Sequence, residues 1–222
     1  MHDNKSAFAS YEYDVKIKQT FPYYDDFFEQ ITDLVKTVFD HPVSWLDVGC
    51  GTGKMGEVAH RNVELERFVF SDASEGMMSV AKKNHSCPQD EFLVCDVLDL
   101  PYKDEFNVIT AVQVFHFFHV QDRQKALKRC YEALKEDGLL ITFENFAPFT
   151  KIGQTIDLKK WKEFQMRQGK TLEEANQHID RYGKAYFPVT IEEHLKLMRE
   201  CGFKVVEILW VSNMQVGLWG LK

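Results

Sequence analysis

The sequence predicts an α/β fold with one mostly parallel sheet of seven strands, helices packed against it and an antiparallel hairpin at the end. Three observations lead to this prediction. Between residues 43 and 145, short apolar runs alternate with segments whose apolar residues recur at helical spacing, the pattern of repeated βα units. Three successive predicted strands end in an aspartate, at Asp47, Asp72 and Asp96. The chain closes with two apolar runs around the turn Ser212-Asn213, as in a hairpin.

The composition is typical of a globular protein. The chain has 222 residues, of which 45% are apolar and 27% are charged, so we expect one large domain or a domain with an insert. The net charge is -7. Because contacts with phosphates come from Lys and Arg, an acidic protein of this kind is a poor binder of bare nucleic acid.

The cysteines and the N-terminus indicate the compartment. No two cysteines have C-x-x-C spacing, so the sequence predicts neither a zinc site nor a disulfide framework, and we expect no metal ion. Reduced thiols in the cytoplasm are the simplest interpretation. The start Met1-His2-Asp3-Asn4-Lys5 has no apolar run behind it, and no stretch approaches ~18 apolar residues. We therefore expect no signal peptide, no membrane span and a cytoplasmic protein. The five cysteines are Cys50, Cys87, Cys95, Cys130 and Cys201.

The first 40 residues are expected to form an arm followed by a helix. Residues 1–20 are polar with scattered aromatic residues, which suits a flexible arm or a lid. A helix is predicted to begin at Pro22, a favoured first position for proline, and its apolar stripe is expected to pack on the core. The tyrosines ahead of this apolar stripe have three alternative roles: they cover a ligand, line a substrate pocket or pack on the surface. These tyrosines are Tyr11, Tyr13, Tyr23 and Tyr24.

The remaining elements follow in βα order. Gly138 is expected to end a helix, and Thr190 with Glu193 has the pattern of a capping box for the last helix, which ends at Gly202. The predicted strands are 44–48, 67–71, 91–95, 106–112 and 139–143, the helices are 54–60, 74–84, 121–135 and 191–200, and the hairpin strands are 203–211 and 215–221.

The stretch Trp45–Gly53 is the centre of the predicted site. A short apolar run ends at Asp47, and glycines follow at alternate positions, Gly49, Gly51 and Gly53, before a helical segment. Glycine allows a sharp turn and a close approach of a ligand to the main chain. The free N–H groups at the start of a helix favour an anionic or hydrogen-bonding ligand.

Three interpretations of this glycine turn compete. A phosphate loop is excluded because only three residues separate Gly49 from Gly53 and Met55 follows Lys54. A dinucleotide fingerprint is matched by Gly51–Gly56, which satisfies G-x-G-x-x-G. The third is a cofactor without a pyrophosphate, because the carboxylate of Asp47 would repel a pyrophosphate but suits a cationic or amino-bearing ligand.

The next two strand ends complete a binding crevice. From Gly53 to Asp72 is about the 20-residue interval at which an acidic residue binds a ribose hydroxyl. Asp72 can instead cap the next helix, for which Ser74 is an equally good candidate. Asp96 can accept from the amino group of an adenine while Val97 lies against the ring. In an open α/β sheet the carboxyl ends of such strands share one crevice.

The fourth predicted strand is followed by candidates for chemistry. Gln113 lies where the strand end should face the ligand. His116 is a candidate general base, because histidine titrates near neutrality, although such a residue can also simply pack or cap. Tyr13 and Tyr182 are further candidate bases.

Residues 145–188 do not continue the alternation of strands and helices. We expect this insert to cover the substrate, because a segment after the fifth strand lies over the sheet edge that carries the predicted binding crevice. The segment carries a net charge of +3, so the rest of the chain is about -10; an ordinary solvated helix face also explains the excess. The basic residues are Lys151, Lys159, Lys160, Lys162, Arg167, Lys170, Arg181 and Lys184, and the acidic ones are Asp157, Glu163, Glu173, Glu174 and Asp180.

The glycine stretch Asp47-Val48-Gly49-Cys50-Gly51-Thr52-Gly53 resembles motif I of class I S-adenosylmethionine-dependent methyltransferases, D-x-G-x-G-x-G. The later strand ends match that family's motifs over about residues 43–145. The resemblance implies a Rossmann-like fold, S-adenosylmethionine as cofactor with S-adenosylhomocysteine as product, and in-line methyl transfer. The terminal hairpin also distinguishes this sheet from the all-parallel sheet of dehydrogenases.

A weaker resemblance covers most of the chain. The segments Ile17–Tyr24 and Gly202–Lys222 and the insert resemble the branch of carboxy-S-adenosylmethionine synthases, once named tRNA (cmo5U34)-methyltransferases. In that branch an arginine near the end of the insert holds the extra carboxylate of the cofactor, and Arg181 lies at the similar position. The glycine loop departs from those synthases, which usually lose one glycine. Carboxy-S-adenosylmethionine synthesis, or modification of a tRNA wobble uridine, is therefore the alternative function.

The resulting prediction is a single methyltransferase domain over residues 1–222. Its parts are an arm and helix (1–40), a cofactor-binding core (43–145), a helical substrate cover (146–188) and a last helix with the hairpin (189–222). We expect a small-molecule acceptor, tRNA only as an indirect partner, and a monomer or homodimer; a non-catalytic binding module is the remaining hypothesis. The expected cofactor-binding residues are Asp47, Gly49, Cys50, Gly51, Gly53, Asp72, Ala73, Met77, Asp96, Val97 and Gln113. The expected catalytic residues are His116, Tyr13 and Tyr182, and the expected substrate contacts are Arg181, Tyr23 and Trp161.

Overall fold

The computed structural model describes residue 4 and residues 6–222. Residues 1–3 and 5 lie outside the described residues. They belong to the stretch on which the prediction of no signal peptide rests. None of the described helices is both long enough and apolar enough to cross a membrane.

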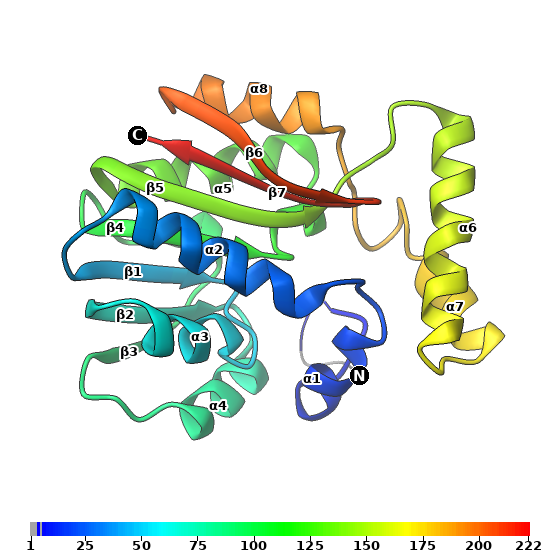
Figure 1. The fold of residues 1–222 in the computed structure, drawn as a ribbon, viewed down its shortest axis with the longest axis horizontal. Coiled ribbons are helices and arrows are strands. Elements are labelled where there is room, and N and C mark those ends of the chain that lie inside the picture. Colours follow the sequence, from blue (N-terminus) through cyan, green and yellow to red (C-terminus); the bar gives the residue numbers. More distant parts are fainter. Residues whose placement is uncertain (1–3, 5) are drawn as a thin grey trace.

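The described residues form one sheet of seven strands in the order β3-β2-β1-β4-β5-β7-β6 (Figure 1). Strands β1 to β5 are parallel to one another, and β7 runs antiparallel between β5 and β6. This confirms the predicted fold class. The strands are β1 (Val43–Val48), β2 (Leu65–Asp72), β3 (Asp90–Val94), β4 (Phe106–Val112), β5 (Leu134–Asn145), β6 (Val205–Ser212) and β7 (Gln215–Leu221), and the helices are α1 (Tyr13–Lys18), α2 (Tyr24–Val38), α3 (Lys54–Asn62), α4 (Glu75–Asn84), α5 (Val120–Ala133), α6 (Lys151–Arg167), α7 (Leu172–Ile179) and α8 (Ile191–Cys201).

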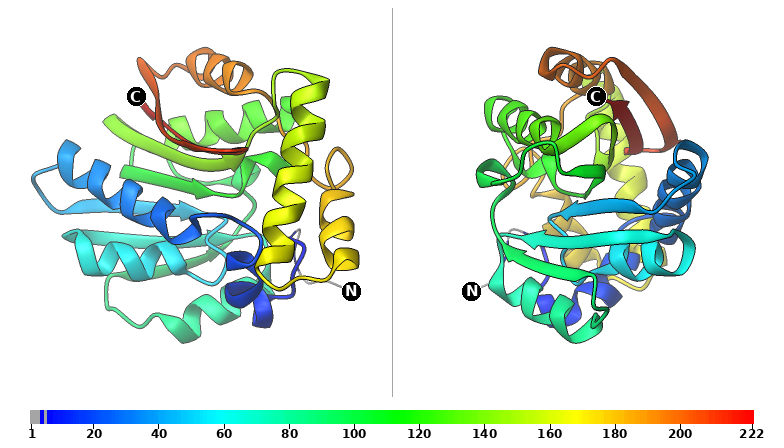
Figure 2. Two further views of the ribbon diagram at one scale, coloured as in Figure 1. Left: turned by 45° about the vertical axis from the view of Figure 1, so that its right-hand side comes forward. Right: turned by 90° about the vertical axis from the view of Figure 1, so that its left-hand side faces the viewer.

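Helices cover both faces of the sheet, as Figure 2 shows. Every residue of β1 is buried, because a central parallel strand has a hydrophobic layer on each side. Successive side chains of a strand point to opposite faces. Trp45 accordingly packs in one core with apolar residues of α2, α3 and α4. Leu46 packs in a second core with apolar residues of α5 and α8.

The N-terminal arm and the insert lie together at the end of the sheet where the parallel strands finish (Figure 1). The arm is helical in part: a 3₁₀ turn over Ser10–Glu12 leads into α1. Two hydrogen bonds join it to the insert. Trp161 Nε1 donates to the carbonyl oxygen of Thr20 at 2.6 Å, and Lys170 Nζ donates to Thr20 Oγ1 at 2.6 Å. The arm is therefore fastened to the α6–α7 insert.

Two predicted boundaries are wrong. Helix α2 begins at Tyr24, because Tyr23 adopts a left-handed conformation with φ of 60° and separates Pro22 from the helix. Gly138 does not end a helix: α5 stops at Ala133, and β5 begins at once with Leu134, which pairs with Phe106 of β4. Pairing with a neighbouring strand is a tertiary effect that local propensity does not report.

The predicted helix ends are confirmed where a side chain or a glycine forms the cap. Ser74 Oγ accepts from the amide of Met77 at 3.1 Å and caps α4. Thr190 and Glu193 form the predicted capping box of α8, and Gly202 ends that helix with φ of 114°. These short-range signals position the loops that surround the site.

Candidate functional site

A cavity of about 390 Å³, here called the outer cavity, lies at the carboxyl ends of β1, β2, β3 and β4. The aspartate-ended strands converge there, as expected for an open α/β sheet. The N-terminal arm supplies part of the wall. The lining residues are Asn4, Ser6, Tyr13, Gly49, Gly51, Asp72, Ala73, Ser74, Met77, Cys95, Asp96, Val97, Val112, Gln113, Val114 and Phe117.

Two of the cavity glycines have a left-handed backbone, and one of them also has no room for a side chain. Gly49 has φ of +64°, and an added Cβ would lie 2.5 Å from Val114 Cγ2. Gly51 has φ of +55°, and the nearest atom to an added Cβ is Tyr13 Cε1 at 4.0 Å. Left-handed backbone favours glycine. The bare main chain of Gly51 thus borders the outer cavity opposite Tyr13.

Asp72 is fixed by the backbone on both sides. Its Oδ2 accepts from the amide of Gly51 at 2.9 Å, and its Oδ1 accepts from the amide of Ser74 at 2.8 Å. These bonds join the end of β2 to the glycine loop and orient the carboxylate along the cavity wall. A carboxylate has about four acceptor positions, so it can still accept from a ligand hydroxyl.

Asp96 also lines the outer cavity. Its Oδ1 accepts from the amide of Leu98 at 3.1 Å, which caps a short 3₁₀ turn over Val97–Asp99. Val97 itself is buried and lines the wall, as does Met77 of α4. This wall therefore pairs an acidic acceptor with apolar surface, the combination predicted for an adenine.

Three predicted cofactor-binding residues do not line the outer cavity: Asp47, Cys50 and Gly53. Gly53 instead caps α3 with φ of 92°, and an added Cβ would lie 2.6 Å from His85 Nε2. Cys50 is buried beneath the loop. Asp47 is buried and accepts from Thr110 Oγ1 at 2.7 Å. Burial raises the pKa of Asp47 to about 7, although the bond from Thr110 opposes this rise.

Gln113 occupies the junction between the outer cavity and a second pocket. Its backbone is left-handed with φ of 61°, a strained conformation for a residue other than glycine. Its Nε2 donates to Gln215 Oε1 at 2.9 Å, whereas its buried Oε1 has no hydrogen-bond partner among the described residues. An unpaired buried acceptor is costly and can be satisfied by a donor on a bound ligand.

The second pocket, here called the inner pocket, measures about 40 Å³ and lies between the N-terminal arm, β4, β5 and the insert. It shares Ser6, Tyr13, Gln113 and Phe117 with the outer cavity. Its walls are mainly apolar and aromatic, and among the described residues no carboxylate lines it. The remaining lining residues are Ala7, Phe8, Ile17, Phe21, His116, Asn145, His178, Arg181 and Tyr186.

His116 is held in the inner pocket by a buried carboxylate. His116 Nδ1 and Glu144 Oε2 are 2.7 Å apart, and Glu144 also accepts from the backbone amides of Val114, Phe115 and His116. Burial alone would raise the pKa of Glu144, but the hydrogen bond and charge of His116, the amide of Phe115 and the charge of Arg123 lower it below its ordinary value. An ionised Glu144 fixes the ring and leaves Nε2 as the nitrogen able to act on a ligand.

The insert places Arg181 in the wall of this pocket and Lys170 close to it, against the ring of Phe8. Burial lowers the pKa of Arg181, and it lowers the pKa of Lys170 to about 8. Burial, with Lys170 and Arg181 nearby, lowers the pKa of His178 to about 3, so its ring is neutral. Neither ring nitrogen of His178 has a hydrogen-bond partner among the described residues, and its ring stacks on Phe8 at 6.1 Å.

The other predicted catalytic and substrate residues divide into two groups. Tyr13 lines both pockets, but burial and the neighbouring Asp72 raise the pKa of its phenol, so it is a hydrogen-bond donor rather than a base. Tyr182 lines neither pocket and packs against Tyr186. Tyr23 and Trp161 lie at a separate hollow beside the end of β6, so the structure does not bring these two to the inner pocket.

Several residues of the site were not predicted, notably His178 and Tyr186, which line the inner pocket, and Glu144, which binds the ring of His116. Glu144 directly follows the predicted strand 139–143, as Asp47, Asp72 and Asp96 end or follow their predicted strands, and that pattern could have identified it. The sequence carries no comparable signal for His178 or Tyr186, because both belong to the irregular insert.

Residues 46–138 match a family model described as a methyltransferase domain. The matched segment contains the glycine loop together with Asp72 and Asp96, which line the outer cavity, and the buried Asp47. With the observed sheet order, this match makes residues 46–138 similar in sequence and fold to the methyltransferase domain of class I S-adenosylmethionine-dependent enzymes.

Among enzymes of this class, the chain is similar over nearly its whole length to carboxy-S-adenosyl-L-methionine synthases. It is 21% identical to the Staphylococcus epidermidis protein, over 98% of this chain and 96% of that one. It is 23% identical to the Nautilia profundicola protein, over 95% and 94%. Among solved structures, it resembles magnesium protoporphyrin IX methyltransferase from Synechocystis with bound S-adenosylhomocysteine, with a TM-score of 0.64 and 15% identity over 92% of this chain and 86% of that one.

Proposed function

We propose that this protein binds S-adenosylmethionine in the outer cavity and transfers its methyl group to a small molecule held in the inner pocket. The observation that carries the proposal is that the two spaces share Tyr13, Gln113 and Phe117. A methyl group at this junction would lie between the cofactor and an acceptor. The cofactor supplies an activated methyl group, so the chain itself needs chiefly to align the reactants and exclude water.

The acceptor chemistry is indicated by the inner pocket. Aromatic walls favour a small, largely apolar molecule. His178 offers one donor and one acceptor with no partner, and Arg181 brings a positive charge. The acceptor therefore carries an oxygen-bearing polar or anionic group on an apolar frame, and His116, oriented by Glu144, accepts the proton of its nucleophile.

The proton role of His116 can be tested with a panel of small phenols, carboxylic acids and amines, using release of S-adenosylhomocysteine as the readout. With any acceptor found, His116→Gln should lower kcat by about 100-fold or more while leaving the affinity for S-adenosylmethionine nearly unchanged. Arg181→Lys serves as a matched control that keeps the charge in the pocket and spares the base. An unchanged kcat in His116→Gln would refute the base assignment.

The alternative function is that of a carboxy-S-adenosylmethionine synthase. One observation favours it: Arg181, the residue expected to hold an additional carboxylate, lines the inner pocket next to the junction residues. The similarity to proteins of that name extends over nearly the whole chain.

Native mass spectrometry of the ligand retained by the purified protein distinguishes the two functions. The first proposal expects S-adenosylmethionine or S-adenosylhomocysteine. A ligand heavier than S-adenosylmethionine by one carboxyl group would replace it with the alternative, and Arg181→Ala should then lose that ligand but still bind plain S-adenosylmethionine. A retained NAD would contradict both.

The remaining proposals concern the setting of the reaction. We expect a cytoplasmic monomer or homodimer in which residues 146–188 cover the substrate. We expect tRNA to be involved only through another component, since the chain carries a net charge of -7. A salt-sensitive gel shift with bulk tRNA would contradict this expectation.

A further inference from the structure

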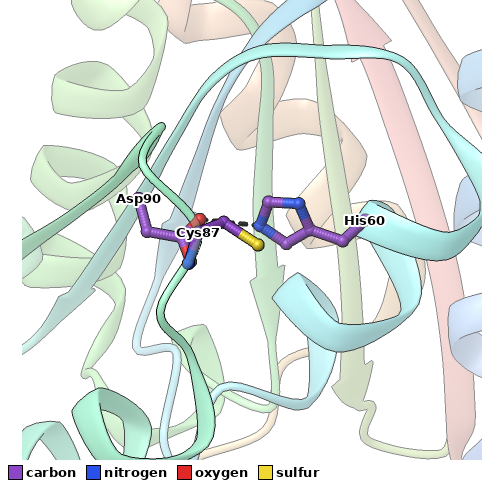
Figure 3. Close-up of side chains that lie close together, drawn as sticks. All are labelled: His60, Cys87 and Asp90. Carbon is purple, nitrogen blue, oxygen red and sulfur yellow. Dashed lines mark hydrogen bonds and ion pairs between the residues drawn. The ribbon is translucent and has the colours of Figure 1, made fainter.

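Three side chains of metal-ligating type lie close together, as Figure 3 shows. None of them lines the outer cavity or the inner pocket. His60 belongs to α3, Cys87 lies in the loop between α4 and β3, and Asp90 is the first residue of β3. One donor atom of each lies within 4.8 Å of the other two. Asp90 stands at the amino end of β3, whereas the outer cavity lies at the carboxyl ends of the strands. The cluster is therefore separate from the methyl-transfer site.

Two of the three side chains are already fixed toward each other. His60 Nε2 and Asp90 Oδ1 are 2.6 Å apart, and only 16% and 1% of these two side chains are exposed. The other oxygen of Asp90 accepts from the backbone amide of Cys87 at 3.1 Å, which folds the loop so that the thiol lies on the same side. Cys87 is exposed and stands at the mouth of the cluster. An ion pair of His60 and Asp90 would not require a thiol in this position.

We propose that His60, Cys87 and Asp90 bind a divalent metal ion of the zinc type. An imidazole nitrogen, a thiolate and a carboxylate oxygen are the ligands that Zn²⁺ takes in proteins, whereas Mg²⁺ and Ca²⁺ prefer oxygen alone. On binding, the thiol of Cys87 loses its proton to solvent, and the contact between His60 and Asp90 is replaced by one bond from each to the metal. Water can occupy the fourth position.

The geometry requires only a local adjustment. Metal–ligand bonds of about 2.0–2.3 Å place tetrahedral donors about 3.3–3.8 Å apart, so the cluster must contract slightly around Cys87 and open slightly between the other two. The residues around Cys87, from Ser86 to Gln89, are all exposed and can move. The metal would then fasten the end of α3 to the start of β3.

This site also has a physical link to the glycine loop. The ring of His85 lies 6.5 Å from the ring of His60, and His85 Nε2 lies 2.6 Å from where a Cβ of Gly53 would stand. A metal at the cluster would thus hold the segment that packs behind the glycine loop. We expect a structural role for the ion, and the inference holds whether or not the chain transfers a methyl group.

The test uses the metal-free full-length protein kept reduced, with Co²⁺ as a spectroscopic probe and Zn²⁺ as competitor. We expect one Co²⁺ per chain, visible absorption of tetrahedral type, a thiolate-to-metal charge-transfer band in the near ultraviolet, and displacement by Zn²⁺. Zn²⁺ should also raise Tm. Absence of one-to-one binding would refute the proposal.

Variants identify the ligands independently of activity. Cys87→Ser changes an exposed loop residue, so the fold should persist, and it should abolish the charge-transfer band and the Zn²⁺-dependent rise in Tm. Asp90→Asn should weaken Zn²⁺ binding at least about tenfold. Cys95→Ser, at the other cysteine that is not buried, should keep the complete Co²⁺ spectrum. A charge-transfer band that survives in Cys87→Ser would overturn the assignment.

Discussion

At the scale of single residues, Asp47 ends a short chain of buried hydrogen bonds beneath the glycine loop. Trp45 Nε1 donates to Thr110 Oγ1 at 2.9 Å, and Thr110 Oγ1 donates to Asp47 Oδ1 at 2.7 Å. Burial raises the pKa of Asp47 to about 7, and the nearby Asp72 adds to the rise. A carboxyl group with a pKa near 7 is partly protonated at neutral pH. A positive charge in the adjoining cavity favours its ionised form.

The affinity for S-adenosylmethionine should therefore depend on pH through Asp47. The sulfonium and ammonium charges favour the carboxylate, so binding releases a proton whenever Asp47 is protonated in the free protein. The association constant should rise by up to about tenfold per pH unit below pH 7 and level off above it. Asp47→Asn should remove this dependence. Calorimetric titrations between pH 5.5 and pH 8 measure both profiles.

S-Adenosylhomocysteine is the matched control, because it lacks the sulfonium charge and should show a shallower profile in the parent protein. An equally steep profile in Asp47→Asn would assign the dependence to another group.

The same pKa shift predicts a change in stability. The folded-state pKa of about 7 lies above the ordinary value of 3.8, so the folded protein holds the proton more tightly than the unfolded chain. The free energy of unfolding then falls as the pH rises from about 4 to about 7, by at most about 4 kcal/mol. Asp47→Asn should be more stable than the parent at pH 8 but not at pH 4.5. Urea unfolding at both pH values measures the difference, and a variant that is less stable at pH 8 would contradict the account.

The residues that could be predicted from the sequence are those with a local signal. Gly49, Gly51 and Asp72 are predicted by short spacings, and all three line the outer cavity. The partnership of Glu144 with His116 joins residues 28 positions apart, so no spacing rule reveals it. Trp161 was expected at the substrate, but its indole nitrogen is used by Thr20 of the arm, a contact that only the folded chain defines.

At the scale of elements, the N-terminal arm packs against the α6–α7 insert beside the inner pocket. Phe8 stacks on His178 at 6.1 Å, and the ammonium of Lys170 lies 5.1 Å from the centre of the Phe8 ring. Asp14 of α1 accepts from Thr52 Oγ1 in the glycine loop at 2.6 Å. Because residues of the arm line both pockets, we expect the arm to move when the cofactor enters or leaves.

Loosening this contact should speed release of the cofactor. Phe8→Ala removes the stacked ring and the cation–π contact, which together contribute on the order of 1–2 kcal/mol. The dissociation rate of S-adenosylmethionine should rise about tenfold, as stopped-flow displacement would measure. Tyr11→Ala is the control, since Tyr11 lies in the same arm but is 85% exposed. Equal rates in the two variants would show that the arm does not limit release.

Boundaries of elements were predictable only where the chain carries its own stop signal. The end of α8 was predicted because Gly202 supplies the left-handed cap. The end of α5 was not, because the residues after Ala133 pair with β4 through Leu134 and Phe106. The sequence pattern indicates that a strand follows, but the partner strand decides where it begins.

At the scale of the whole molecule, the outer cavity is lined from the arm, from the ends of β1 to β4 and from α4. The strands that meet there also carry the two hydrophobic cores on their opposite faces. A ligand in the cavity therefore contacts strands that belong to both hydrophobic cores. Its binding free energy should add to the free energy of unfolding of the whole domain.

S-Adenosylmethionine at about 100 times its Kd should raise the free energy of unfolding by about 2.7 kcal/mol. For a domain of this size, that corresponds to a rise in Tm of about 5–10 °C, measurable by scanning calorimetry. NAD should leave Tm unchanged, because Asp47 and Asp72 oppose a pyrophosphate at the glycine loop. Gly51→Val supplies the matched variant: φ of +55° is strained for valine, and its side chain points to the cavity side near Tyr13. That variant should be less stable and should also lose the shift with S-adenosylmethionine. A rise in Tm with NAD, together with none with S-adenosylmethionine, would mean that the glycine loop serves a dinucleotide after all.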